Sequence, residues 1–240
     1  MPSLRLDGRA THELRPLHFT RSWIPTLPGS VLVDSGLTRV LCTAVVEEGV
    51  PKFLKGTDQG WVTAEYSMLP AATNSRRPRD RNGRIDGRSV EIQRLIGRAL
   101  RAIVDRRKLK GRTVWVDCDV LAADGGTRTA AINGAYVALH DALRDLQQRD
   151  GLKSWPLVDS VQAISVGLVE GEPHVDLSYY EDSSAEVDMN LILTGKGRII
   201  EMGGGAEQGT FSLDQLAAMT EMGRAALARI KAVQSQALQS

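Results

Sequence analysis

The stretch Thr113–Gly134, TVWVDCDVLAADGGTRTAAING, decides the fold of this chain. It opens with an apolar run rich in β-branched residues, Thr113–Leu121, which predicts a buried strand. Asp124-Gly125-Gly126 then breaks the run, as a turn that needs relaxed backbone angles does. The small residues of 130–134 follow, and they suit a helix pressed close to a sheet. The stretch therefore predicts a strand, a glycine turn and the start of a helix.

The first turn of this helix has the properties of an anion site. Free backbone N–H groups and the positive end of the helix dipole meet there. Thr127, Arg128 and Thr129 add two hydroxyls and a guanidinium. The same residues would also suit an ordinary turn in which Asp124 caps the helix and Arg128 points to solvent. No Gly-Lys-Ser/Thr follows the glycines and the third glycine of a dinucleotide fingerprint is absent, so a free inorganic anion fits better than a nucleotide.

Length and composition are those of a globular protein. The 240 residues are 42% hydrophobic and 25% charged, and 30 basic against 29 acidic residues leave a net charge of +1. This balance is ordinary for a soluble domain and does not indicate a nucleic-acid binder. Cys42 and Cys118 lie in apolar runs without metal-ligand spacing, which is typical of a reducing compartment. The charged N-terminus and the lack of a long apolar run lead us to expect a cytoplasmic protein.

Hydrophobic patterns along the chain predict one compact α+β domain over residues 1–240. The securest helix is Arg88–Arg106, whose apolar residues recur at helical spacing. A second helix should run from Thr127 to about Gln148, and a C-terminal helix over about 212–235 should follow the glycines of 203–205. Strands are predicted at Leu14–Thr20, Ser30–Asp34, Arg39–Glu47, Gly60–Met68, Val161–Val169, His174–Tyr179, Val187–Thr194 and Arg198–Met202.

An arginine-rich segment, RRPRDRNGRIDGR at Arg76–Arg88, has six arginines, two aspartates and no apolar pattern, and it predicts an exposed loop over about 70–88. Such a loop is either simply solvated or grips a phosphate backbone. Aromatic residues are missing nearby, so any RNA binding would not read the base sequence. Arg88 begins the secure helix, where a guanidinium and a helix dipole act together, and it is a candidate second clamp on the anion.

An acidic segment, EDSSAEVDMN at Glu181–Asn190, is the candidate partner of the anion site. Asp182 and Asp188 can converge if the residues between them form a tight corner. A carboxylate pair beside a bound phosphate suits Mg²⁺. The alternative is a solvated acidic turn. Against that alternative, Asp188 lies inside an apolar strand, where a carboxylate needs a partner.

Other common chemistries are not supported. The chain has no Gly-x-Ser-x-Gly nucleophile elbow, and its four histidines show no metal-ligand spacing. Neither cysteine has an evident activating neighbour.

Seven stretches together resemble the ribonuclease PH family of phosphate-dependent exoribonucleases. They are spread over about the first four fifths of the chain, and together they are far more specific than a short motif. The stretches are ELRP at Glu13, VLCTA at Val40, EEGVPKFLKG at Glu47, GWVTAEYSMLP at Gly60, EIQRLIGRALRA at Glu91, CDVLAADGGTRTAAING at Cys118 and EDSSAEVDMN at Glu181.

The resemblance implies an α+β fold of mixed sheets packed with helices, with a left-handed βαβ crossover that departs from the usual hand. It implies a ring of six subunits, a trimer of dimers. Its phosphate site falls on Arg88, Gly126, Thr127 and Arg128. Its catalytic and metal-associated aspartates fall on Asp182 and Asp188, and arginines of its tRNA-contacting loop fall on Arg76 and Arg79.

Two departures from the family pattern stand out. Relatives often have arginine after Met-Leu-Pro, whereas this chain has Ala71, so the RNA contacts can shift onto Arg77 and Arg81. Relatives often read Gly-Thr-Ala-Glu where this chain has Gly204-Gly205-Ala206-Glu207, and a Pro-Phe pair has become Thr210-Phe211. The role of the segment 203–210 is therefore open.

The function implied is phosphorolysis of RNA 3′ ends, especially those of tRNA precursors. Inorganic phosphate would be the co-substrate, Mg²⁺ the metal, and nucleoside diphosphates the product of a reversible reaction. One alternative is a catalytically silent ring subunit that only binds RNA, and such a subunit could dispense with the anion clamp and the carboxylates. A polynucleotide phosphorylase-like enzyme would need a duplicated core, for which 240 residues leave no room.

Overall fold

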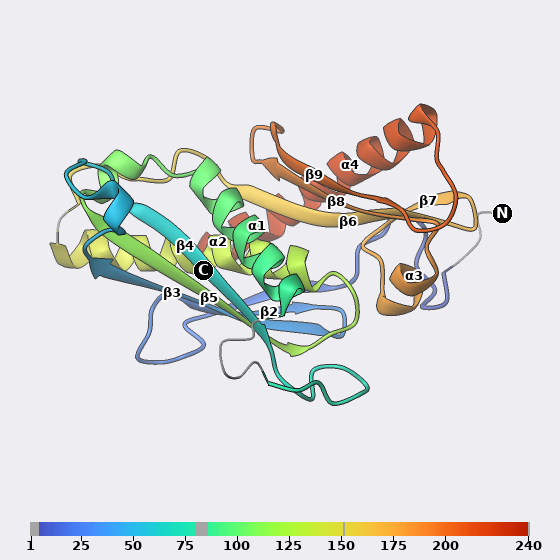
Figure 1. Ribbon diagram of the computed structural model, residues 1–240, viewed down its shortest axis with the longest axis horizontal. Coiled ribbons are helices and arrows are strands. Elements are labelled where there is room, and N and C mark those ends of the chain that lie inside the picture. Colours follow the sequence, from blue (N-terminus) through green and yellow to red (C-terminus); the bar gives the residue numbers. More distant parts are fainter. Residues whose placement is uncertain (1–4, 80–85, 151, 240) are drawn as a thin grey trace.

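The computed structural model describes residues 5–79, 86–150 and 152–239, and two β-sheets dominate it (Figure 1). The five-stranded sheet has the order β1-β2-β3-β5-β4, and the four-stranded sheet has the order β7-β6-β8-β9. The strands are β1 (Leu17–Arg21), β2 (Ser30–Ser35), β3 (Thr38–Glu48), β4 (Trp61–Met68), β5 (Arg112–Ala122), β6 (Val161–Val169), β7 (Glu172–Val175), β8 (Val187–Thr194) and β9 (Ile199–Ala206).

The predicted central strand is β5, which lies between β3 and β4. It pairs antiparallel with β3, where Cys42 stands opposite Cys118 and both are buried as expected. It pairs parallel with β4, and the helix α1 (Gly87–Ala102) belongs to the connection between these two strands. The ends of β4 and β5 therefore reach the same edge of the sheet as the start of α1 (Figure 1).

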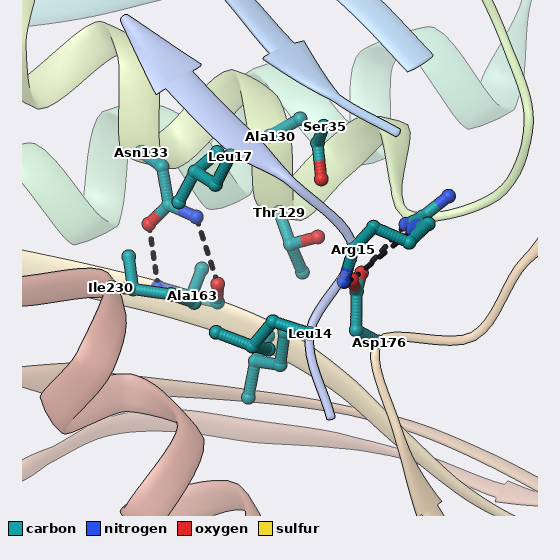
Figure 2. A pocket seen from close by; sticks show the side chains of 11 residues that line it. Leu14, Arg15, Leu17, Ser35, Thr129, Ala130, Asn133, Ala163, Asp176 and Ile230 are labelled. Carbon is teal, nitrogen blue, oxygen red and sulfur yellow. Dashed lines mark hydrogen bonds and ion pairs between the residues drawn. The ribbon is translucent and has the colours of Figure 1, made fainter. Parts of the chain in front are cut away.

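The helix α2 (Thr127–Asp150) lies between the two sheets, packing on β2 and β3 on one side and on β6 on the other. Its small residues allow this close approach. A Cβ atom on Gly134 would lie 2.3 Å from a methyl carbon of Val33 and 2.7 Å from the sulfur of Cys42. The Asn133 amide donates to the Ala163 carbonyl and accepts from the Ala163 N–H, both at 2.9 Å, and so ties α2 to β6 (Figure 2).

The C-terminal helix α4 (Leu213–Gln239) covers the four-stranded sheet, and its apolar stripe completes a second, smaller core with β6 and β8. Two 3₁₀ segments, η1 (Lys52–Leu54) and η2 (Arg106–Leu109), and the short helix α3 (Tyr179–Ser184) complete the secondary structure. Among the described helices, none combines the length and the apolar character needed to cross a lipid bilayer.

The α+β class is confirmed. The five-stranded sheet is mixed, because β4 and β5 are parallel, whereas the strand pairs of the four-stranded sheet are antiparallel. Several predicted boundaries need correction: β1 begins at Leu17 and not at Leu14, and α4 continues to Gln239 and does not end near 235. The helix predicted to reach Arg106 ends at Ala102, because Val104 leaves the helix to form an isolated bridge with Leu157. The strand predicted over His174–Tyr179 ends at Val175, because Asp176 takes a left-handed conformation (φ 53°) and α3 follows. The strand β9 continues through the glycines to Ala206, whereas the sequence predicts that it ends at Met202.

Candidate functional site: an anion turn facing a carboxylate pair

The glycine turn between β5 and α2 is held against the loop that precedes α3. Gly125 and Gly126 both adopt left-handed backbone angles, with φ of 74° and 64°. A Cβ atom on Gly125 would lie 2.5 Å from the Leu177 carbonyl oxygen and 2.8 Å from the Tyr179 nitrogen. The Tyr179 N–H in turn donates to the Asp124 carboxylate at 3.3 Å. Asp124 thus links the turn to α3, whereas the sequence left open that it caps α2.

Thr127 is the first residue of α2 and is buried, and a tyrosine that the sequence did not single out fixes its hydroxyl. The Tyr66 hydroxyl, carried by β4, hydrogen-bonds the Thr127 hydroxyl at 2.8 Å. Burial raises the pKa of Tyr66, although the Thr127 hydrogen bond and the charges of Arg88 and Arg128 oppose this shift. Thr129, the other hydroxyl expected at the site, donates to the Gly126 carbonyl at 2.9 Å and so stabilises the turn itself.

The predicted clamp residues Arg88 and Arg128 lie in the first turns of two different helices, and both act electrostatically on the same carboxylate pair. Arg128 lies in the first turn of α2, with 18% of its side chain exposed and one guanidinium nitrogen 3.2 Å from a carboxylate oxygen of Glu91. Arg88 lies exposed in the first turn of α1. The charges of both arginines act on the pKa of Asp182 and of Asp188. Arg128 therefore faces the site, not bulk solvent.

The acidic segment forms a short capped helix where the sequence predicts a tight corner. Ser178 accepts a hydrogen bond from the Glu181 N–H, and the Glu181 carboxylate accepts one from the Ser178 N–H, so both free donors at the start of α3 are satisfied. The Asp182 N–H donates to the Ser178 carbonyl at 2.9 Å. This helix brings Asp182 to Asp188, the second residue of β8.

The two carboxyl groups of Asp182 and Asp188 interact directly. Burial raises the pKa of Asp182, against the charges of Arg88 and Arg128. Burial together with the neighbouring charge of Asp182 raises the pKa of Asp188 to about 6. Two half-buried carboxylates side by side cannot both ionise cheaply unless a cation joins them. The pair therefore has the electrostatics of a site that takes up either a proton or a metal ion.

The residues present fit a magnesium ion. Within the described part of the chain, the buried Oδ1 oxygen of Asp188 has no hydrogen-bond partner. Hard oxygen donors are the ligands that Mg²⁺ prefers, and it commonly uses only one or two carboxylates and completes its shell with water and phosphate oxygens. No group of three or more His, Cys, Asp or Glu side chains in the described residues is arranged to hold a metal ion by itself.

Buried arginines near the N-terminus hold this arrangement together, and the sequence analysis did not assign them a role. Arg15 pairs with Asp176 at 2.6 Å (Figure 2). It also donates to the Asp124 carbonyl at 2.5 Å. Arg5 forms a two-pronged ion pair with Glu181. Burial opposes ionisation of Glu181, but the Arg5 hydrogen bonds prevail and lower its pKa to about 2. In the sequence, the signal for the Arg15 contact is its place in the ELRP stretch. Its partner Asp176 lies 161 positions later in the chain.

The cavity beside Arg15 in Figure 2 is structural. Its volume of about 10 Å³ has room for about one water molecule, so no substrate fits there. A larger cleft of about 380 Å³ borders the site between α1 and the β8–β9 pair. Its lining includes Glu91, Arg128, Asp188, Asn190, Glu201 and Glu207, together with the backbone of Gly203–Gly205.

Residues 77–79 of the arginine-rich segment lie beside the start of α1. Arg77 and Arg79 line a cavity of about 150 Å³ together with Asp86 and Ser89. Arg77 donates to the Asp86 carboxylate at 3.2 Å, whereas Arg76 and Arg79 are exposed. Arg81 lies outside the described residues.

Comparison with protein families finds two adjacent matches. Residues 13–145 match domain 1 of the 3′ exoribonuclease family, and residues 159–226 match domain 2. The first match alone covers more than half of the chain, and the anion turn lies within it, whereas both aspartates of the pair lie within the second.

Similar folds occur among solved structures. The crystal structure of rice (Oryza sativa) Rrp46 is 24% identical, with a TM-score of 0.79 over 98% of this chain and 100% of the rice chain. A chain of the Archaeoglobus fulgidus exosome with RNA bound to the active site is 21% identical, with a TM-score of 0.80 over 96% of this chain and 92% of that chain. A chain of an archaeal exosome core is 20% identical, with a TM-score of 0.79 over 97% of this chain and 91% of that chain. At these identities the likeness shows the fold.

Proposed function

Since the chain belongs to the 3′ exoribonuclease family, we propose that it is an active, phosphate-dependent enzyme that shortens RNA from the 3′ end. The observation that supports this most is the convergence of four elements on one spot. The start of α2 offers an anion site, α1 adds a second arginine, and α3 with β8 adds a carboxylate pair. A silent ring subunit could dispense with two arginines and two carboxylates in one place, so their convergence favours an active enzyme.

Orthophosphate binds first at the start of α2 in this proposal. The Thr127 hydroxyl and N–H groups of the helix start hold its oxygens, and Arg88 and Arg128 balance its charge. Tyr66 keeps the Thr127 hydroxyl in place, so one phosphate oxygen is presented in a fixed direction. That oxygen attacks the phosphorus of the last phosphodiester bond, in line with the bond that breaks.

The bond from phosphorus to the 3′ oxygen of the shortened RNA then breaks. The 3′ oxygen takes up a proton and becomes the new 3′ hydroxyl, and a nucleoside diphosphate leaves. We assign the proton to the Asp182–Asp188 pair, with Asp182 as the donor, because burial raises the pKa of both carboxyl groups. A Mg²⁺ ion beside the same pair would neutralise charge on the equatorial oxygens, with the unpartnered Asp188 oxygen as its ligand while Asp182 carries the proton. One phosphate ester replaces another, so the reaction is reversible.

The RNA body lies toward the arginine loop in this proposal. Arg76 and Arg79 are exposed, and Arg77 and Arg79 line the small cavity beside the start of α1. In the sequence, Arg81 follows two positions after Arg79. Such contacts hold phosphates without reading bases. We further propose tRNA precursors as the substrate and a homohexamer, a trimer of dimers, as the working assembly. A ring would gather several arginine loops around one opening and create a positive field that a chain of net charge +1 lacks.

Incubation of the protein with 3′-tailed tRNA and Mg²⁺, with and without orthophosphate, tests the proposal. We expect shortening only with phosphate, nucleoside diphosphates as the product, and extension of the RNA when nucleoside diphosphates are supplied instead. Equal shortening without phosphate, or nucleoside monophosphates as the product, would refute phosphorolysis. RNA binding without any turnover would favour the silent subunit.

A further inference from the structure

We propose that one end of the five-stranded sheet, here called the basic end, is a second contact surface for RNA, remote from the reacting bond. The basic end comprises residues 52–61, which lead into β4, and residues 101–110, which follow from α1. These two segments contain seven lysines and arginines and two aspartates, although the whole chain has a net charge of only +1. The inference rests on the proposed function, because RNA is the substrate proposed there.

The basic end lies far from the candidate site. The strand β4 runs from Trp61 at the basic end to Met68 beside the site, and its seven residue steps of about 3.3 Å span about 23 Å. The helix α1 packs along β4 and runs back, with Arg88 in its first turn and Arg101 in its last (Figure 1). A stacked strand rises about 3.4 Å per nucleotide, so about seven nucleotides cover this distance.

The fold leaves the charges of η2 at the surface. The Asp105 carboxylate accepts a hydrogen bond from the Arg107 N–H at the start of η2, and Lys110 ends the segment in a left-handed conformation (φ 48°). Leu109 is the buried residue of 106–110, and a Cβ atom on Gly60 would lie 2.4 Å from the Leu109 Cβ. One leucine therefore anchors the segment, while Arg107 and Lys110 are exposed.

Two guanidinium groups lie over the ring of Trp61. The guanidinium carbon of Arg101 is 4.6 Å from the ring centre, and that of Arg106 is 5.4 Å from it. Arg101 also donates to the Val62 carbonyl at 3.0 Å. Phe53, which is 66% exposed, contacts Trp61 edge to face, with ring centres 5.1 Å apart. These contacts hold two cations in place, so less side-chain entropy is lost when they bind a phosphate.

The cations of the basic end are poorly neutralised. Within the described residues, Lys108 lies 3.9 Å from the Asp105 carboxylate, and the other six cations form no ion pair. Burial lowers the pKa of Arg101, and the positive charges of Arg106 and Arg98 lower it further. Cations that repel one another and lack carboxylate partners leave a positive potential, which an anionic ligand relieves.

A hollow beside η2 suits a nucleic-acid backbone. Its volume is about 810 Å³, and its lining consists of Thr57, Asp58, Gln59, Arg107, Lys110 and Gly111. Asp58 is the acidic residue of this lining, whereas the threonine, glutamine, lysine and arginine side chains can donate to phosphate and ribose oxygens. RNA presents a phosphate at every nucleotide, and the exposed ring of Phe53 can stack on a base. The surface therefore fits RNA of any sequence.

The test removes two charges from this hollow. The double variant Arg107→Gln with Lys110→Gln keeps side-chain length and loses the charges. The matched control is Arg224→Gln with Arg229→Gln, two exposed residues of α4 on the other sheet. A third protein, Arg107→Lys with Lys110→Arg, keeps both charges. Binding of fluorescent 3′-tailed tRNA is measured by anisotropy without orthophosphate, from about 50 to 200 mM salt.

We expect the neutral double variant to bind tRNA about fivefold more weakly at low salt. The slope of log affinity against log salt should become shallower by about 1.5, as the loss of two phosphate contacts predicts. The control and the charge-keeping variant should bind as the wild type does. A trinucleotide is too short to reach from the candidate site to the basic end, so its shortening with phosphate should change less than about twofold in every variant.

Three results would overturn the inference. The first is wild-type affinity and salt slope in the neutral variant. The second is an equal loss of activity on the trinucleotide, which would place the effect at the candidate site. The third is dissociation of the neutral variant in light scattering, which would assign the basic end to contacts between copies of the chain.

Thermal unfolding shows whether the neutral variant is folded, and Lys52→Gln with Lys55→Gln takes its place if it is not. The binding measurement does not depend on the reaction. If the wild type shortens RNA without phosphate but tRNA affinity depends on Arg107 and Lys110, the proposed reaction is wrong and the second contact surface stands.

Discussion

At the scale of single residues, Asp188 has the most unusual environment in the candidate site. It is a carboxylate between Val187 and Met189 in a mostly apolar strand. Its Oδ1 oxygen is buried without a hydrogen-bond partner in the described structure, and the carboxyl group of Asp182 lies next to it. The sequence predicts that Asp188 has a partner, because a carboxylate inside an apolar strand needs a hydrogen bond or an opposite charge. The role of Tyr66 cannot be predicted in this way, because a tyrosine in a predicted strand is interpreted as a core residue. Its contact with Thr127 becomes apparent only in the folded structure, where its hydroxyl donates to the Thr127 hydroxyl.

The raised pKa of Asp188 predicts how stability depends on pH. The folded state raises this pKa from 3.8 to about 6, so it binds the proton more tightly than the unfolded chain. The resulting stabilisation is complete below pH 4 and is lost as the pH rises through 6. Asp188→Asn should therefore stabilise the protein by about 1–3 kcal/mol at pH 8 and have little effect at pH 4.

Urea unfolding in EDTA at both pH values measures this effect. Asp58→Asn, on an exposed loop, serves as the control and should change the free energy of unfolding little at either pH. If Asp188→Asn destabilised the protein at pH 8, the pKa of Asp188 would not be raised in the folded state.

Arg128 is the most informative residue for catalysis. Arg128→Ala removes a fixed positive charge from the proposed phosphate site and should lower kcat by about a hundredfold or more. Arg224→Ala is the control, because Arg224 is a surface residue of α4 whose ion pair is with Glu221. Equal rates for Arg128→Ala and wild type in RNA shortening with phosphate would remove Arg128 from the site.

At the scale of elements, the glycine turn is where sequence and structure agree best. The strand, turn and helix predicted from Thr113–Gly134 appear as β5, the left-handed glycines and α2. The acidic segment was harder to predict. Its short helix depends on the Ser178–Glu181 capping box and on Arg5, which lies 176 positions away from Glu181. Local periodicity cannot reveal a helix held by such distant contacts.

Substitutions at two glycines measure how much the packing of the glycine turn against α3 contributes to stability. Gly125→Ala and Gly171→Ala both place alanine at nearly the same left-handed angle, with φ of 74° and 76°. Only at Gly125 does the new Cβ meet backbone atoms, those of Leu177 to Tyr179. We expect a loss of about 1 kcal/mol for Gly171→Ala and about 3 kcal/mol or more for Gly125→Ala.

Denaturant unfolding of the two variants gives the comparison, and RNA shortening by the Gly125→Ala protein reports on the site. Equal losses of stability would show that the turn does not pack against the loop before α3, and the account of how the turn positions α3 would then fail.

At the scale of the whole molecule, the proposal depends on assembly. The resemblance predicts a homohexamer, so light scattering on the purified protein should give about six times the chain mass of 26.1 kDa. RNA affinity should fall steeply with added salt, because several arginine loops would contact phosphates together. A stable monomer that binds RNA equally well would contradict this account of RNA capture.

The most direct test of the central claim traces the phosphorus atom of orthophosphate into the products. The protein is incubated with an unlabelled 3′-tailed RNA, Mg²⁺ and ³²P-labelled orthophosphate, and the products are separated. If orthophosphate bound beside Thr127 and Arg128 is the nucleophile, the label appears in the β-phosphate of the released nucleoside diphosphate. Release of unlabelled nucleotides would contradict the claim, because water would then have cut the bond.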